Sequence, residues 1–152
     1  MQNNSIVQTL KTLFVRDLTK LKDEISLYSN EPAIWRIDHN IANSAGNLCL
    51  HLVGNLNTYI GAELGKTGYI RNRELEFSAT DVPREELISK IIGTIDVVGK
   101  TLDQLKDDQL DEEYRVLVFQ EKTSTQFMLI HLATHLGYHL GQVNYHRRLL
   151  DV

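Results

Sequence analysis

Residues 128–142 read MLIHLATHLGYHLGQ, an apolar run in which a histidine recurs at every fourth position. An α-helix advances about 100° per residue, so His131, His135 and His139 fall on one side of such a helix. Imidazole is usually exposed or only partly buried, and three on one helical stripe need a reason. A metal ion is the reason that this spacing favours.

The rest of the chain predicts four long helices. Amphipathic or apolar helical patterns cover residues 5–29, 43–64, about 82–105 and about 124–149. Sequences of the capping-box type open the first helix at Ser5 and the last at Thr123, and Pro83 fits the first turn of the third. We expect Gly65 to end the second helix in a left-handed conformation.

The segments between these helices are polar or short. Residues 66–82 show no clear period and predict a long crossover between the second and third helices. Residues 114–119 are rich in β-prone side chains and predict a short extended segment or hairpin arm. The fold class is therefore all-α, a four-helix bundle with a long crossover between helices 2 and 3, formed by a single domain over residues 1–152.

Composition is that of an ordinary soluble domain, with 24% charged and 42% hydrophobic residues. The net charge of −4 argues against a nucleic-acid partner. No run reaches the roughly 18 apolar residues of a membrane span, so we expect no membrane partner. A single cysteine, Cys49, excludes an internal disulfide, and residues 1–5 lack a signal peptide's features. We expect a cytoplasmic protein.

A metal site in such a bundle needs ligands from facing helices. The second helix offers one histidine, His51, within an apolar run. A buried histidine bonded to a backbone carbonyl is the alternative for His51 taken alone. Three imidazoles with one open position are typical of catalytic zinc sites. Zinc protease and di-iron patterns are absent, because Leu136 follows His135 where a glutamate is required and no glutamate lies three residues before a histidine. An all-imidazole mononuclear site suits zinc, nickel, iron or copper.

These motifs resemble the DinB-like (DinB/YfiT) superfamily over nearly the whole chain. Residues 43–56, NSAGNLCLHLVGNL, resemble its helix-two motif, and residues 135–142, HLGYHLGQ, its helix-four motif. The resemblance implies His51, His135 and His139 as the ligands of a divalent metal. Members commonly carry an arginine after the last ligand, where this chain has Leu140.

Four further residues are candidates for supporting the ligands. His131 is assigned a supporting role, because it lies about 12 Å along the helix axis from His139. Gln142 lies one turn beyond His139 and can hydrogen-bond a ligand. Asn47 and Asn55 flank His51 at four residues on either side and can orient its ring. Other polar groups are given no role, and His39 and His146 are expected at the surface.

The resemblance implies a metal-dependent enzyme, for which we consider an S-transferase using a low-molecular-weight thiol of the bacillithiol or mycothiol type. A metal-dependent hydrolase is a related possibility, although the sequence offers no convincing general base. A non-catalytic metal-binding bundle or a dimeric interaction module is the alternative from another class. The expected partners are a small-molecule substrate and a second copy of the chain, in a homodimer.

Overall fold

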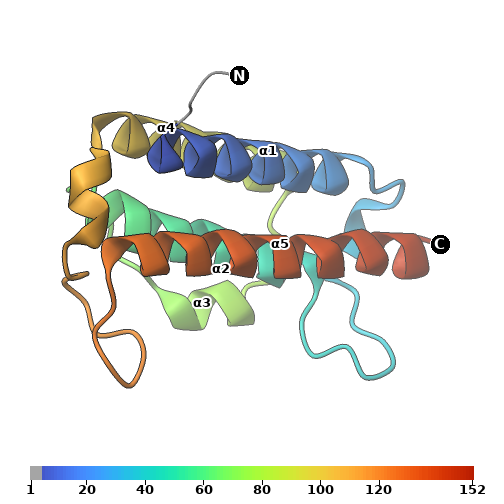
Figure 1. Cartoon of the computed structure of the whole chain (residues 1–152). Helices are drawn as coiled ribbons and strands as arrows, with labels where there is room; N and C mark the ends of the chain where they lie inside the picture. The colour runs from blue at the N-terminus through green and yellow to red at the C-terminus, as the bar shows by residue number, and fades with distance from the viewer. Residues whose placement is uncertain (1–4) are drawn as a thin grey trace.

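A computed structural model describes residues 5–152 as an all-helical chain (Figure 1). It has five α-helices and three short helical segments of other types. The α-helices are α1 (Ile6–Ser26), α2 (Ala45–Leu56), α3 (Arg73–Ser78), α4 (Arg84–Gln104) and α5 (Thr125–Leu150). Two segments are 3-10 helices, η1 (Glu31–Trp35) and η3 (Asp107–Asp111), and the π-helix η2 (Asn57–Ala62) continues directly from α2.

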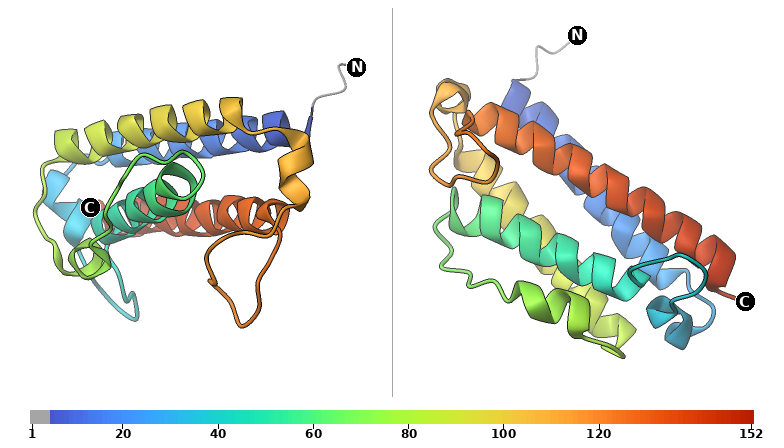
Figure 2. Two further views of the ribbon diagram at one scale, coloured as in Figure 1. Left: turned by 90° about the vertical axis from the view of Figure 1, so that its left-hand side faces the viewer. Right: turned by 90° about the horizontal axis from the view of Figure 1, so that it is seen from below.

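The four long helices lie in two layers (Figure 1). α1 and α4 pack side by side in one layer, and α2 and α5 form the other. α1 also contacts α5, and α2 also contacts α4, so each layer covers the other. The short helix α3 lies on the outer side of α2, away from α5 (Figure 2). The expected all-α class is confirmed, with five α-helices instead of the expected four.

The core lies where the two layers meet. Phe14 and Leu18 from α1, Leu52 from α2 and Ile91 from α4 are fully buried, and Leu136 from α5 is almost so. Burying a side chain of this size stabilises the fold by about 1.5–3 kcal/mol. The apolar stripes that predicted the helices are therefore the surfaces that join them.

Serine hydroxyls cap three of the long helices. Ser5 accepts a hydrogen bond from the backbone N–H of Gln8, and Ser44 caps α2 in the same way. Ser124 accepts from the N–H of Phe127 at the start of α5. The capping sequence at Thr123 is therefore used one residue later than its pattern indicates.

The crossover differs from its sequence interpretation. Residues 66–82 were expected without helix, but they contain α3, which begins where the Asn72 side chain accepts from the N–H of Leu75. The left-handed residues near the end of η2 are Lys66, at φ 54°, and Gly68, at φ 76°. Gly65 is needed for packing instead, because a Cβ there would meet the Thr101 side chain and lie 2.8 Å from the carbonyl oxygen of Gly61.

The β-prone segment 114–119 is not a strand. The described residues contain one isolated antiparallel bridge, between Glu113 and Ser124. Tyr114 is buried, and its hydroxyl donates to the carbonyl oxygen of Tyr59 in η2 at 2.7 Å. The bridge closes the loop and the buried Tyr114 anchors it to the bundle, so the segment is held in place without a β-sheet. Across residues 5–152, no helix has the length and apolarity needed to cross a bilayer.

Candidate metal centre

Three histidines converge between α2 and α5. The Nε2 atom of His51 lies 3.2 Å from Nε2 of His135, which lies 3.1 Å from Nε2 of His139. One ring nitrogen from each of the three falls within 4.8 Å of the others. Because His135 and His139 are one turn apart on α5, they approach His51 from the same side. We call these residues the histidine triad.

The spacing of the triad fits a metal ion. Metal–imidazole bonds of about 2.0–2.1 Å place tetrahedral ligand nitrogens about 3.3 Å apart and neighbouring octahedral ones about 2.9 Å apart. The two Nε2–Nε2 distances lie between these values. Both distances are therefore compatible with nitrogens that share one divalent ion.

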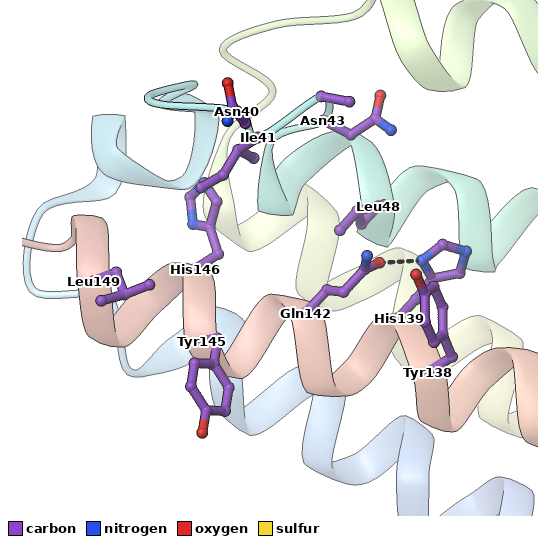
Figure 3. A pocket seen from close by; sticks show the side chains of 11 residues that line it. Asn40, Ile41, Asn43, Leu48, Tyr138, His139, Gln142, Tyr145, His146 and Leu149 are labelled. Carbon is purple, nitrogen blue, oxygen red and sulfur yellow. Dashed lines mark hydrogen bonds between the residues drawn. The ribbon is translucent and has the colours of Figure 1, made fainter.

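The outer nitrogens of two triad members face hydrogen-bond acceptors. Nδ1 of His51 lies 3.2 Å from Oε1 of Glu76, and Nδ1 of His139 lies 2.6 Å from Oε1 of Gln142 (Figure 3). Nδ1 of His51 also lies 3.3 Å from Nη2 of Arg71, a donor that bonds Oε1 of Glu76 at the shorter distance of 2.8 Å. Assigned from the acceptors Glu76 and Gln142, both rings carry their proton on Nδ1. Their Nε2 lone pairs then point at the shared centre, which is the tautomer that a metal ligand requires.

The ring nitrogens of His135 are not satisfied by the residues around them. Its Nε2 faces two Nε2 lone pairs and has one proton at most to share, so at least one lone pair in the triad faces another without a proton between them. Its Nδ1 is buried and has no hydrogen-bond partner within residues 5–152. Burial, with the neighbouring His139 and His51, lowers the pKa of His135 to about 4, so it is neutral at pH 7. A cation at the centre of the triad satisfies the facing Nε2 lone pairs, and the Nδ1–H of His135 stays without a partner within residues 5–152.

A buried ion pair supports His51 from the crossover. Glu76, only 6% exposed, comes from α3, and both its carboxylate oxygens accept from the Arg71 guanidinium at 2.8 Å. Arg71 also lies over the ring of Tyr59, 5.8 Å from its centroid, in the π-helix that extends α2. π-Helical turns are frequent at functional sites. Held by Arg71, Glu76 gives His51 a carboxylate partner of the kind that orients metal-bound histidines.

Neither Glu76 nor Arg71 was identified from the sequence, because residues 66–82 show no period. Glu76 is the fourth residue of a helix of only six, too short for a hydrophobic pattern to show. Burial lowers the pKa of His51, and the hydrogen bond to Glu76 opposes that effect. The carboxylate thus favours proton retention on Nδ1, the nitrogen that faces away from the triad.

The four residues expected to support the ligands take different places. Gln142 bonds His139 directly, as described above. His131 stacks against His135, with ring centroids 6.1 Å apart, and meets the Phe119 ring edge-on at 4.8 Å. His131 therefore contacts a triad ring and forms part of an aromatic border beside it.

The two asparagines on α2 make no hydrogen bond to His51 among those that the structure describes. Asn47 donates to the carbonyl oxygens of Glu76 and Ala79, at 3.0 and 2.8 Å, and so fixes α3 against α2. Asn55 is buried, and its Oδ1 has no partner within residues 5–152. Asn47 thus holds the backbone of Glu76, whose carboxylate bonds His51, and makes no described bond to the His51 ring.

Two of the remaining expectations concern other histidines. His39 is exposed, as expected. His146 is buried at 4% exposure, so its expected place at the surface is wrong. Its Nδ1 bonds the Tyr28 hydroxyl at 2.7 Å and its Nε2 the carbonyl oxygen of Arg36 at 2.8 Å. Cys49 is enclosed in the core, where burial raises its pKa to about 12 and keeps it a thiol.

Comparison with known proteins identifies the family. The sequence from residue 2 to residue 151 matches the family described as DUF1572, protein of unknown function. The chain belongs to the DUF1572 family. No curated protein matches this DUF1572 chain. Its fold is similar to that of a solved structure, "Crystal structure of the conserved protein of locus from Enterococcus faecalis". That similarity has a TM-score of 0.76 at 16% identity, and covers 97% of this chain and 98% of the other. This likeness shows the fold alone.

Proposed function

We propose that this DUF1572 chain is a DinB-like four-helix bundle that binds one divalent metal ion at His51, His135 and His139. The convergence of the three histidines carries the proposal, because Nε2 of His135 lies 3.2 Å from Nε2 of His51 and 3.1 Å from Nε2 of His139. The donor set of neutral imidazoles suits zinc, nickel or iron, and three protein ligands leave a position for a substrate.

In this proposal the surrounding residues hold the ligands in a form ready to bind. Glu76 and Gln142 accept the Nδ1–H groups of His51 and His139, which keeps both Nε2 lone pairs directed inward. Arg71 bonds both oxygens of Glu76 and fixes the carboxylate in place. Partners of this kind limit the movement of the rings when a ligand is exchanged.

We propose an enzyme that transfers a low-molecular-weight thiol to an electrophile. A bound divalent ion supplies the acidity that converts a thiol into its nucleophilic thiolate at neutral pH. Hydrolysis is the related alternative, and the carboxylate that bonds the triad gives it no general base. Glu76 already accepts from Arg71 and lies against His51, so it is poorly placed to take a proton from an attacking water.

Metal stoichiometry tests the ligand assignment. Untagged protein loaded with zinc, nickel or ferrous iron and then desalted should retain about one ion per chain. His51→Ala, His135→Ala and His139→Ala should each lose it, whereas His39→Ala, an exposed histidine, should not. Retention of metal by any of the three triad variants would remove that residue from the site.

A chelator separates the catalytic proposal from a purely structural metal. If the ion has an open position for substrate, removing it should lower the melting temperature by only a few degrees, and thiol consumption with model electrophiles should require the metal. Complete unfolding on chelation would favour a structural ion instead. Metal-independent thiol transfer would contradict the proposed chemistry directly.

A further inference from the structure

A pocket of about 490 Å³ lies beside the triad. The loop 36–44 and the start of α2 form one wall, and the C-terminal half of α5 forms the other (Figure 3). His139 and Gln142 line it, so the pocket adjoins the triad. Its volume falls within the range of small-molecule sites, about 300–1,000 Å³.

The pocket lining carries no formal charge. None of the residues that line it is a carboxylate, a lysine or an arginine, and Ile41, Leu48 and Leu149 supply apolar surface. A charged ligand group placed here would lose water without gaining an opposite charge. The lining therefore disfavours ions of either sign.

Three arginines lie close to the pocket in sequence, and none of them is among the residues that line it. Arg148 lies over the Tyr145 ring, 5.4 Å from its centroid. Arg36 donates to the carbonyl oxygen of Leu150 at 2.8 Å, and Arg147 donates to Glu24 at 2.7 Å. Burial lowers the pKa of His146, and both its ring nitrogens are bonded, so at neutral pH it presents an uncharged ring to the pocket.

The lining also carries uncharged polar side chains, the amides of Asn40, Asn43 and Gln142 and the hydroxyls of Tyr138 and Tyr145. Of these, Gln142 is the one that bonds a triad ring. Gln142 uses its Oε1 to accept from His139, which leaves the two N–H donors of its amide for a ligand. A carbonyl or ether oxygen bound there would lie next to the His139 ring. Apolar walls with a few placed polar groups are the usual means by which a pocket orients a neutral molecule.

We propose that this pocket binds an uncharged, largely apolar organic group that carries a hydrogen-bond acceptor, with the acceptor at Gln142 and the apolar part against Ile41, Leu48 and Leu149. That this ligand is the substrate of the metal centre rests on the proposed function. The binding preference does not, because it follows from the lining alone.

Three probes of similar size test the preference: benzamide, benzoate and benzylammonium. Binding is measured by NMR titration of chelator-treated protein at pH 7.0, so that no metal can attract benzoate and failure of the metal proposal cannot affect the result. Benzamide should bind at least tenfold more tightly than either ion. Equal or tighter binding of benzoate or benzylammonium, or no binding of benzamide, would overturn the proposal.

A charge added to the wall gives a second, independent readout. Ile41→Lys should raise the affinity for benzoate relative to benzamide at least tenfold, because it supplies the missing cation. Ile92→Lys is the matched control, since Ile92 is an exposed isoleucine of α4 outside the pocket and should leave the ratio unchanged. An unchanged ratio in Ile41→Lys would place the probes elsewhere and refute the assignment.

Discussion

Glu76→Gln is expected to weaken metal binding 10–100-fold, although Glu76 is not itself a proposed ligand. The substitution keeps an oxygen for the Nδ1–H of His51 but removes the negative charge that strengthens this bond. Loss of such partners of metal-bound histidines typically costs 10–100-fold in affinity. At about 1.4 kcal/mol for each factor of ten, the expected loss is about 1.4–2.8 kcal/mol.

The same change also lowers the stability of the metal-free protein. The side chains of Arg71 and Glu76 are 14% and 7% exposed, so the pair is buried. Removing one partner of a buried pair costs about 3–5 kcal/mol, and we expect the lower end because the new amide oxygen can still accept from Arg71. Combining Glu76→Gln with Arg71→Met removes the uncompensated cation, and should restore part of the stability without restoring metal affinity.

Competition with a chromophoric zinc chelator measures the affinity, and urea unfolding of chelated protein measures the stability. Glu74→Gln is the matched control, because Glu74 is an exposed carboxylate on the same short helix. Both quantities should stay at wild-type values in this control. Wild-type zinc affinity in folded Glu76→Gln would refute the role assigned to the carboxylate.

Two further predictions concern packing and pH. Gly54→Ala should destabilise the protein by about 1–3 kcal/mol and weaken metal binding, because the added Cβ would collide with the Glu76 carboxylate; Gly93→Ala, which meets nothing, should be neutral or stabilising. Metal-free protein should lose stability as pH falls below about 6.5. Burial lowers the pKa of His146, as it does for two triad histidines, so these groups take up protons in the unfolded chain before they do so in the folded one. In urea titrations from pH 7.5 to 5.0, His146→Gln should reduce this slope by at most about 1.4 kcal/mol per pH unit. A slope equal to that of the wild type would contradict the buried state of His146.

The long helices could be predicted because each has an apolar stripe of many turns. Phe14 and Leu18 recur at helical spacing and are fully buried, as the periodicity of α1 indicates. The histidine spacing on α5 carried the same kind of information, since positions four apart must lie on one side of a helix. His51 required only that α2 pack against α5, which it does.

What the sequence could not show depends on contacts between distant segments. Glu76 is polar, lies in a helix of six residues and reaches the triad because Asn47 fixes α3 to α2. His146 resembles a surface residue of a helix end until the Tyr28 hydroxyl and the Arg36 carbonyl are placed against its ring. Local periodicity carries no signal for such pairings, since their partners are separated by 25 residues or more.

X-ray absorption spectroscopy of the zinc-loaded protein tests the central claim most directly. The account predicts three imidazole nitrogens at about 2.0–2.1 Å, one exchangeable oxygen ligand and no sulfur. His135→Ala should lose this imidazole shell. A sulfur ligand at about 2.3 Å, which would have to come from Cys49, or a shell unchanged in His135→Ala, would contradict a metal centre at the histidine triad.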